Sequence, residues 1–481
     1  MSQLSAVLEA VRGRVQPDAD EREQLEAAAS ELERRAGEAI DELPVDADVL
    51  RAGSTARSTW LAGDRDIDLF VRFPPDLDSQ TLERHGLTVG HEILPDGREE
   101  YAEHPYVTGE YAGFDVDLVG CFDVAAATEI RSSVDRTPFH TAYLHDRLDD
   151  EIANEVRLAK QFLTGIGAYG SDLKTRGYSG YLTELLTLEY GGFVSLLEAA
   201  ADWTPPIRLD PEAHGTTSFN DPLVVIDPTD PERNVAAVCV ASNVARLQHH
   251  ARAFLDTPTT ERFFPPDRAP LDPPAVQTHL RRRGTTPVAV RLDPPDLVPD
   301  ELWPQLRKSL SGIHDGLEAH GFEVVRSRAM VGEQAVLFFE LSVASRPQIE
   351  YHEGPPVAVR EHAQEFYQTY ASDTPAHGTD SATGGEPTAD SDSDNRAADP
   401  VSGSAGAYGP LIQADRYVVE RSREFTDAVS FLESAAVMDV SLGASLTACV
   451  EDRDVIAGDG VAELATDFGA EFRDYFEPRY P

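Results

Sequence analysis

The sequence predicts a multidomain α+β protein, with a mixed-sheet head, a helical central domain and an α+β C-terminal region. Its 481 residues are enough for two to four domains, each able to bury its own core. Two strand-like apolar runs, at 66–73 and 114–122, lie among helical patterns in the first part of the chain. From about residue 268 the pattern changes to proline-rich turns and short strands.

These changes in pattern suggest four regions. We expect the head at 1–142, the helical central domain at 143–267, and the C-terminal region at 268–371 and 410–481. Residues 372–409 contain Ser, Asp, Gly, Ala, Thr and Pro with almost no large apolar side chain, so we predict a disordered acidic insertion there.

The individual elements follow from hydrophobic periodicity and from turn residues. We predict helices at 3–15, 19–43, 79–86, 147–165, 182–200, 234–255, 301–320 and 424–435. We predict strands at 49–52, 66–73, within 87–122 (notably 106–109 and 114–122), and at 288–291, 323–326, 335–341 and 411–423.

Two acidic residues, Asp66 and Asp68, open the apolar run at 66–73. Side chains alternate across a strand, so carboxylates at i and i+2 share a face while their apolar neighbours point into a core. Neighbouring carboxylates repel each other, and a divalent cation is the usual reason to keep them; hard oxygen ligands suit Mg²⁺. Asp117, in the run at 114–122, adds a third carboxylate. The sequence therefore predicts a catalytic two-metal site made of Asp66, Asp68 and Asp117.

The Asp-x-Asp pattern alone is weak evidence. Such pairs also occur in stretches typical of solvated surface, for example at Asp452 and Asp454. The structural alternative is a pair of exposed acids at a sheet edge. Asp64 and Asp115 share the strand faces with the predicted ligands, and register relative to the apolar runs favours the set given above.

The charge of the chain is strongly negative. It carries 85 acidic and 41 basic residues, a formal charge of −44, and only three of the basic residues are lysines (Lys160, Lys174 and Lys308). Taken alone, this charge argues against binding nucleic acid, because phosphates would be repelled. Acidic excess with almost no lysine is also typical of adaptation to a salt-saturated cytoplasm, where the Debye length falls to about 3 Å and distant charges are screened. The charge therefore describes the solvent more than the ligand.

The cysteines and the apolar runs of the sequence indicate in which cellular compartment the protein is expected. Cys121, Cys239 and Cys449 lie far apart and form neither a metal-binding spacing nor a disulfide framework. We see no signal peptide and no apolar run long enough to span a bilayer. We therefore expect a soluble cytoplasmic protein with no membrane partner.

Four segments resemble a known family: GSTARSTWL at 53–61, DIDLFV at 66–71, VDRTPFH at 134–140 and YGSDLKTRGYSGYLTEL at 169–185. The Gly-Ser turn, Asp-x-Asp and later Asp resemble the polymerase-β-like nucleotidyltransferase superfamily. The fuller strings are similar to the archaeal (class I) CCA tRNA nucleotidyltransferases, and HEGPPV at 352–357 is a weaker match. The resemblance covers most of the chain and implies a polymerase-β-like head and an RNA-binding C-terminal region.

The resemblance also implies nucleotide-binding roles in the head. Ser54, the backbone after Gly53 and the Arg57 guanidinium are expected to bind the triphosphate of ATP or CTP. The structural alternatives are a turn hydrogen bond for Ser54 and a surface charge for Arg57. The resemblance implies that His140, whose alternative is a structural role, reaches the nucleotide as well.

Three further residues are expected to bind the nucleotide. Lys160 is retained in a chain nearly free of lysine, and a compact ammonium suits a single phosphate oxygen better than a guanidinium does. The ring of Tyr169 can support a base or ribose, the alternative being a loop aromatic that closes a core. Arg233 is the candidate for base selection, because the family's corresponding loop faces the incoming base.

The implied activity is addition of C, C and A to the 3′ end of tRNA from CTP and ATP without a nucleic-acid template, with Mg²⁺ as cofactor. Poly(A) polymerases and oligonucleotide synthetases share the head and are the enzymatic alternatives; a catalytically dead RNA-binding relative is the non-enzymatic one. The expected partners are tRNA, through its 3′ end and acceptor stem, and the two nucleotides. The sequence leaves monomer and homodimer open.

Overall fold

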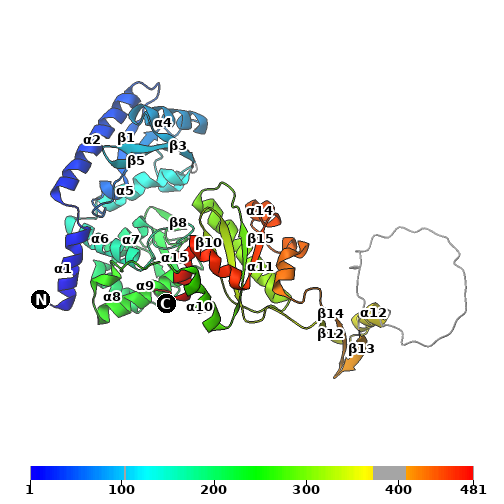
Figure 1. The fold of residues 1–481 in the computed structure, drawn as a ribbon. Coiled ribbons are helices and arrows are strands. Elements are labelled where there is room, and N and C mark those ends of the chain that lie inside the picture. Colours follow the sequence, from blue (N-terminus) through cyan, green and yellow to red (C-terminus); the bar gives the residue numbers. More distant parts are fainter. Residues whose placement is uncertain (1, 102–103, 372–407, 480–481) are drawn as a thin grey trace, which may run out of the picture. The chain divides into compact units, whose positions relative to one another are not determined.

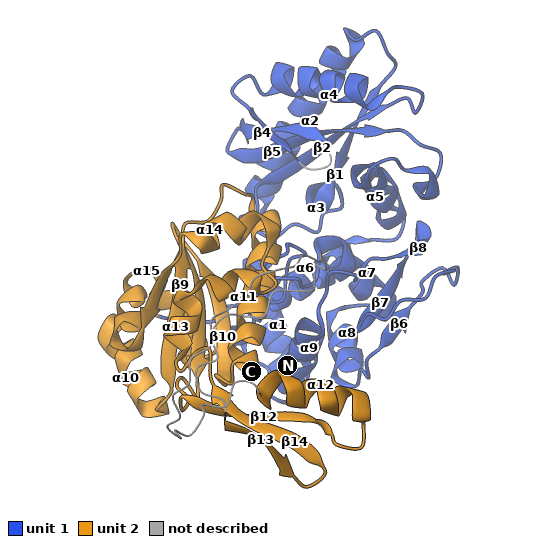
Figure 2. Cartoon of the chain, turned by 90° about the vertical axis from the view of Figure 1, so that its right-hand side faces the viewer, with its two compact units in different colours: residues 1–268, 480–481 blue, residues 269–479 orange. Residues whose placement is uncertain are grey.

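The computed structural model describes residues 2–101, 104–371 and 408–479. The chain divides into two compact units, one ending at Arg268 and the other beginning at Ala269 (Figure 2). Helices and sheets are present in both, which confirms the predicted multidomain α+β class. The domain limits within the units remain predictions. The predicted insertion at 372–409 lies outside the described residues, apart from Tyr408 and Gly409, which begin a strand.

Among its described residues the first unit contains nine α-helices, a five-stranded sheet and a three-stranded sheet; Figure 1 labels most of these elements. Its helices are α1 (Gln3–Val15), α2 (Ala19–Asp41), α3 (Gly53–Ala56), α4 (Ser79–Ile93), α5 (Thr137–His145), α6 (Asp150–Gly165), α7 (Gly180–Tyr190), α8 (Phe193–Ala201) and α9 (Ala241–Asp256). Its strands are β1 (Asp48–Ala52), β2 (Asp66–Phe73), β3 (Arg98–Tyr101), β4 (Pro105–Tyr111), β5 (Phe114–Phe122), β6 (Ile207–Leu209), β7 (Leu223–Asp227) and β8 (Asp230–Asn234).

The head contains a five-stranded sheet of order β1-β2-β5-β4-β3. The central pair β2 and β5 is parallel and the other pairs are antiparallel, so the sheet is mixed, as predicted. Alternate side chains of β2, including Ile67 and Leu69, are fully buried against α2 and α4. Asp66 and Asp68 therefore lie on the opposite face, as side-chain alternation requires.

Helix α4 is longer than the sequence predicted. We expected a helix at 79–86 and strands from 87, but the helix continues to Ile93. Leu82, Val89 and Ile93 recur at helical spacing and are buried against the sheet. Gly86 faces Gly120 of β5, and a Cβ added at Gly86 would lie 3.5 Å from the Gly120 Cα. The helical spacing of the apolar residues was present in the sequence, so the prediction of strands from residue 87 was wrong; the packing of Gly86 on Gly120 is a tertiary contact that no local pattern shows.

The helices α6 to α9 share one core with α1. The helix predicted at 182–200 is divided at Gly191 and Gly192, both of which have positive φ (74° and 135°). The helix predicted at 234–255 begins only at Ala241, because residues 230–234 form strand β8 beside β7. Arg233 therefore lies in a strand and not in a loop that leads into a helix.

The second unit has a four-stranded sheet of order β10-β11-β9-β15 and a three-stranded sheet of order β12-β14-β13. Its strands are β9 (Thr286–Leu292), β10 (Val324–Val331), β11 (Ala335–Leu341), β12 (Ile349–Pro356), β13 (Tyr408–Gln413), β14 (Arg416–Ser422) and β15 (Asp454–Ala457), and its α-helices are α10 (Pro273–Arg283), α11 (Pro299–Ala319), α12 (Arg360–Ala371), α13 (Ala428–Glu433), α14 (Thr447–Glu451) and α15 (Ala465–Phe476). Strand β11 is buried along its whole length, including the Glu340 carboxylate, which is paired with Arg283. The strand predicted at 411–423 is a hairpin of β13 and β14.

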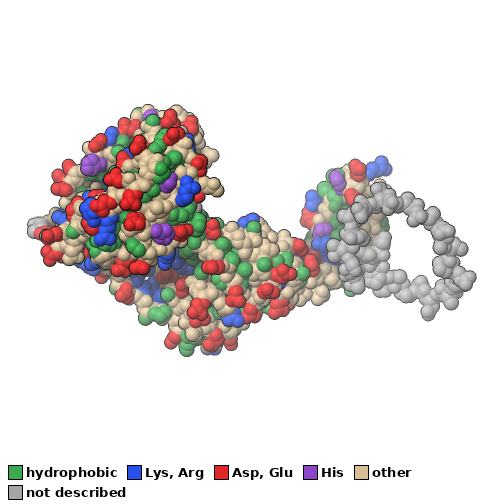
Figure 3. All heavy atoms as spheres, turned by 90° about the horizontal axis from the view of Figure 1, so that it is seen from above, with side chains coloured by type: hydrophobic (Ala, Val, Ile, Leu, Met, Phe, Trp, Pro, Cys, Tyr) green, Lys and Arg blue, Asp and Glu red, His purple; other side chains and the backbone are tan. Residues whose placement is uncertain are grey.

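Acidic side chains are spread over the visible surface, as the composition predicted (Figure 3). Many are paired with arginine, for example Arg34 with Glu31 and Glu38 on α2. Such exposed pairs contribute little to stability individually, about 0–1 kcal/mol. Across the ranges that the structure describes, no helix combines the length and the apolar character needed to cross a membrane.

Candidate functional site

Four aspartates form a row on one face of the head sheet. In the parallel pair β2–β5, Asp66 is in register with Asp115, and Asp68 with Asp117. Residues paired in this way project from the same side of a sheet, so the predicted ligands Asp66, Asp68 and Asp117 lie on one face together with Asp115. Asp66 and Asp115 are exposed, whereas Asp68 and Asp117 are half-buried.

The electrostatics of this row are unfavourable for its own charges. Burial raises the pKa of Asp68 to about 6, with further contributions from Asp117 and Asp66 that outweigh the opposing charge of Arg57. Burial, together with neighbouring acids, also raises the pKa values of Asp66 and Asp117. A bound cation would stabilise these carboxylates in their ionised form, because it would offset the repulsion among them.

The Gly53-Ser54 turn lies directly against Asp68. Gly53 has a positive φ of 67°, and a Cβ built on it would be only 1.8 Å from Oδ2 of Asp68. Any side chain at position 53 would therefore displace the carboxylate, and the positive φ disfavours one in addition. The glycine of the turn and the aspartate of the strand fit each other, which explains why position 53 is a glycine.

The donor set of this row suits a hard divalent ion. It consists only of carboxylate oxygens, which Mg²⁺ prefers, and the raised pKa values indicate uncompensated negative charge. Within residues 2–101, 104–371 and 408–479, however, no three His, Cys, Asp or Glu side chains already converge on one point.

A second group of charges surrounds Glu184 of α7, which is completely buried. Arg57 pairs with its Oε2 at 2.9 Å, and Lys160 of α6 pairs with its Oε1 at 3.3 Å. The Thr59 hydroxyl also donates to Oε1. Burial raises the pKa of Glu184, but Lys160, Arg57 and the hydrogen bonds outweigh it, so the pKa is lowered and the group is ionised. Glu184 thereby fixes two of the predicted nucleotide-binding cations in place.

The Lys160 side chain is only 3 % exposed. Its Nζ donates to the carbonyl of Thr59 at 3.2 Å, to the Thr59 hydroxyl at 3.1 Å and to Glu184 at 3.3 Å. These acceptors account for all three ammonium hydrogens. A contact between Lys160 and a phosphate stays a prediction, and it would require Nζ to exchange one of these acceptors.

A third group is organised by Asp227 at the end of β7, another fully buried carboxylate. Its Oδ2 is 2.8 Å from Nε2 of His140 and 2.7 Å from Nη1 of Arg233. The His140 ring stacks on Tyr181 with centroids 3.8 Å apart. Burial raises the pKa of Asp227, but bonds from His140 and from Thr229 reverse this and lower it strongly. The structure thus joins His140 and Arg233 through one carboxylate.

Two further predicted residues, Tyr169 and Ser54, lie near these groups. The Tyr169 hydroxyl lies over the first residue of α7, where a Cβ added at Gly180 would be 3.2 Å from it. Burial, with the charge of Glu184, raises the pKa of Tyr169. Ser54 is half-buried in the turn, and its carbonyl accepts the backbone N–H of Thr59 at 2.9 Å. That bond closes the loop which carries both Ser54 and Arg57.

Sequence reasoning missed the residues that hold these groups together. Glu184 and Asp227 position the expected side chains, and Arg157 holds the loop after Arg57 through its carbonyls. A signal was present for Glu184, because an acidic residue in the apolar stretch 182–188 requires a buried partner. For Asp227 the Asp-Pro loop that follows it gave no comparable signal.

The mixed sheet with its aspartate row and adjoining Gly-Ser turn defines a nucleotidyltransferase. The model described as "Nucleotidyltransferase domain" matches residues 33–140, which contain the row. The models "tRNA nucleotidyltransferase, second domain" and "CCA-adding enzyme, C-terminal domain" match residues 154–264 and 283–378 with 391–458.

Similar proteins span the same length. A protein from Halorubrum lacusprofundi named CCA-adding enzyme is 55 % identical over 489 residues, covering 99 % of this chain and 100 % of that protein. A protein of the same name from Haloarcula marismortui is 52 % identical, and the match covers 99 % of each chain. Another, from Halobacterium salinarum, is 54 % identical, and the match covers 100 % of each chain. The chain belongs to the CCA-adding enzyme family.

Proposed function

We propose that this protein adds and repairs the 3′-terminal CCA of tRNA, using CTP and ATP in a single active site without a nucleic-acid template and releasing pyrophosphate. The observation that carries the proposal is the similarity to proteins named CCA-adding enzyme over the whole chain. The aspartate row supports it, because all the carboxylates that nucleotidyl transfer requires are present in register on one sheet face.

The proposed cofactor is Mg²⁺, held by Asp66, Asp68 and Asp117. When bound, the ions lower the pKa of the tRNA 3′-OH and stabilise charge on the triphosphate and the departing pyrophosphate. Asp117 lies on β5, across the row from Asp68 on β2, so carboxylates of both strands could hold the same ions. The raised pKa values support a cation between them.

The loop from Gly53 to Thr59 is the proposed triphosphate site. Ser54 and the backbone after Gly53 donate hydrogen bonds, and Arg57 contributes positive charge next to Asp68. Glu184 holds Arg57 and Lys160 before substrate arrives, which reduces the ordering that binding would otherwise require. Tyr169 supports the base or ribose beside them.

Arg233 is proposed to select the base. Cytosine and adenine each present an amino donor beside a ring-nitrogen acceptor, whereas uracil and guanine present a carbonyl and an N–H. Arg233 can donate to the ring nitrogen, and Asp227 holds one end of its guanidinium. His140 donates to the same carboxylate through Nε2, so Asp227 connects base selection to the head. A buried polar group left unpaired by the wrong base discriminates by roughly 10⁴ or more.

The proposal is tested by incubating the protein with labelled CTP and ATP and a tRNA that lacks its 3′ end. A product extended by at most three nucleotides supports it. A long tail identifies a poly(A) polymerase, and extension of ATP itself identifies an oligonucleotide synthetase. Binding of tRNA without Mg²⁺-dependent pyrophosphate release identifies a catalytically dead relative. Since tRNA is the substrate, the proposal also places the protein in the cytoplasm; light scattering distinguishes a monomer from a homodimer.

A further inference from the structure

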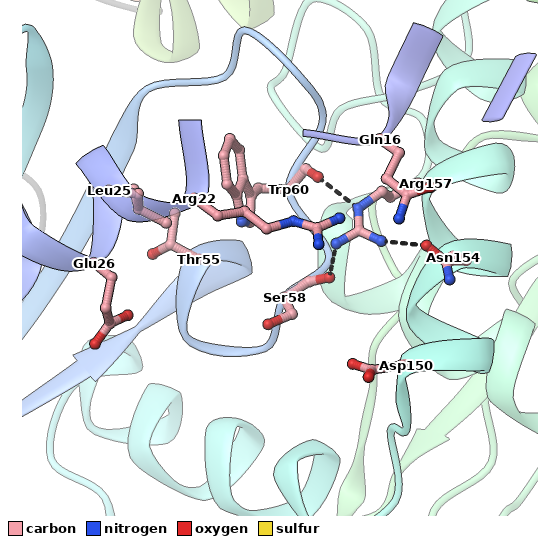
Figure 4. Close-up of a pocket in the computed structure, with 10 residues that line it drawn as sticks. All are labelled: Gln16, Arg22, Leu25, Glu26, Thr55, Ser58, Trp60, Asp150, Asn154 and Arg157. Carbon is pink, nitrogen blue, oxygen red and sulfur yellow. Dashed lines mark hydrogen bonds between the residues drawn. The ribbon is translucent and has the colours of Figure 1, made fainter. Parts of the chain in front are cut away.

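A polar cavity lies beside the loop that carries Ser54 and Arg57. It has a volume of about 490 Å³ and is lined by the α1–α2 connection, the loop itself and α6 (Figure 4). Its lining includes Thr55 and Ser58 of this loop but neither Ser54 nor Arg57, the two side chains proposed to bind the triphosphate. The volume falls in the range of about 300–1,000 Å³ that is usual for ligand sites.

The floor of this cavity contains a buried arginine, Arg157, which is 5 % exposed. Its guanidinium donates to the carbonyls of Ser58 and Trp60 and to Oδ1 of Asn154 at 2.7 Å. Ser58 has a positive φ of 54°, so these bonds stabilise an uncommon backbone conformation. All three acceptors are neutral, and no carboxylate within the described ranges forms an ion pair with Arg157.

A second arginine, Arg22 of α2, reaches across the cavity toward Arg157 (Figure 4). No ion pair involves Arg22 in the part of the chain that the structure describes, although acidic residues outnumber basic ones 85 to 41. Of the two acids that line the cavity, Glu26 is bound by Arg51 at 2.9 Å, which leaves Asp150 at the rim. Burial and the charge of Arg22 lower the pKa of Arg157 to about 10. With Glu26 neutralised by Arg51, two arginines face one aspartate in this cavity, and the charge of Asp150 only partly opposes the lowering of the Arg157 pKa.

Neutral donors complete the cavity. Thr55 lines the cavity and is 5 % exposed, and its buried hydroxyl has no hydrogen-bond partner among the described residues. A buried hydroxyl without a partner is energetically unfavourable, and a ligand that accepts its hydrogen bond removes this cost. Because Oδ1 of Asn154 accepts from Arg157, the NH₂ group of the same amide is left to donate. Gln16 supplies another amide at the rim.

We propose that this cavity binds a phosphate-class oxyanion between Arg22 and Arg157, with hydrogen bonds from Thr55 and Asn154. Guanidinium groups match tetrahedral oxyanions through paired N–H bonds, and an anion here relieves the repulsion between the two arginines. The source is either free inorganic phosphate or pyrophosphate, or a phosphodiester of the RNA backbone. Arg157 also holds the carbonyls of Ser58 and Trp60, so the bound anion contacts the group that supports the loop of the proposed triphosphate site.

The test compares Arg22→Gln with Arg34→Gln. Both remove one arginine charge from α2, but Arg34 is paired with Glu31 and Glu38 and is not part of the cavity. Phosphate and pyrophosphate are titrated calorimetrically into the full-length protein, with EDTA present and the same KCl concentration for every variant. We expect Arg22→Gln to weaken binding at least tenfold and Arg34→Gln by less than twofold. Thr55→Val, which keeps the shape of the side chain, should weaken binding several-fold.

Titration with a tRNA lacking its 3′ end distinguishes the two sources. If the occupant is a phosphodiester, Arg22→Gln weakens tRNA binding about tenfold relative to Arg34→Gln, and inorganic phosphate competes with tRNA. If the occupant is a free anion, tRNA affinity is the same in both variants while phosphate affinity differs. Equal phosphate affinity and equal tRNA affinity in the two variants overturns the proposal, as does tight phosphate binding that survives both Arg22→Gln and Thr55→Val.

Discussion

Replacing Asp68 with asparagine should stabilise the metal-free protein. Asp68 is half-buried beside Asp66 and Asp117, and the described structure gives its carboxylate no hydrogen bond to lose. Burial raises its pKa to about 6 from the ordinary 3.8. At about 1.4 kcal/mol per pH unit, ionisation at neutral pH costs the folded state ~2–3 kcal/mol. Asp68→Asn removes this cost, and we expect a gain of that size at pH 7.

The pH dependence gives the sign of the effect. A carboxyl group whose folded pKa is raised binds its proton more tightly in the folded state, so the wild type regains stability as pH falls. The gain from Asp68→Asn should therefore be full above pH 7, decline below about pH 6 and disappear near pH 4. Asp115→Asn, an exposed neighbour in the same row, is the control and should change stability by less than about 0.5 kcal/mol.

Hydrogen exchange of the β2 and β5 amides in EDTA measures this stability locally, without requiring both units to unfold together. Adding Mg²⁺ should raise protection in the wild type and leave Asp68→Asn unchanged, because a ligand stabilises only the state that binds it. A less stable Asp68→Asn protein at pH 7 would refute the electrostatic reasoning. An equal response to Mg²⁺ in both proteins would refute the ligand assignment.

Three other predictions concern different parts of the molecule. Glu184→Gln should destabilise the first unit by about 3–5 kcal/mol in urea denaturation, because it leaves Lys160 and Arg57 without their buried counter-charge. The control is Glu189→Gln, at an exposed position of the same helix. An equal loss of stability in the two variants would contradict the role of Glu184. Arg233→Ala should lower the ratio of kcat/KM for CTP over UTP more than it lowers turnover with CTP, and an unchanged ratio would place base selection elsewhere. Lowering the KCl concentration should unfold the protein or weaken its binding to tRNA, because repulsion within a net charge of −44 is then unscreened. A steep loss of tRNA affinity as the salt concentration rises, as counterion release causes in most nucleic-acid-binding proteins, would contradict this if the protein stays folded throughout.

Local patterns predicted the parts of the fold that depend on local rules. Strands 66–73 and 114–122 and the helix starts at 3 and 19 match the structure, because strand alternation and helix capping are encoded in neighbouring residues. Asp18 and Glu21, for example, form a capping box at the start of α2. The strand at Arg233 depends on pairing with β7 and was not visible locally, whereas the apolar spacing that continues α4 to Ile93 was present in the sequence and was misinterpreted as strands.

The candidate site shows the same limit. The periodicity of β2 and β5 predicted that the aspartates share a face, and the parallel register brings them together. The resemblance supplied Arg57, Lys160, His140 and Arg233 as candidates, but their arrangement around Glu184 and Asp227 needed the fold. Those carboxylates join segments up to 127 residues apart in the sequence, and a single sequence does not identify which residues form such pairs.

Sequencing the 3′ ends of tRNA products tests the central claim most directly. A tRNA that lacks its last three nucleotides is incubated with the protein, Mg²⁺ and all four nucleoside triphosphates, in parallel with Asp68→Asn and Asp115→Asn. We predict that the wild type and Asp115→Asn add C, C and A in that order and stop, and that Asp68→Asn adds nothing. Ends that contain U or G, a tail longer than three nucleotides, or CCA added by Asp68→Asn would contradict the account.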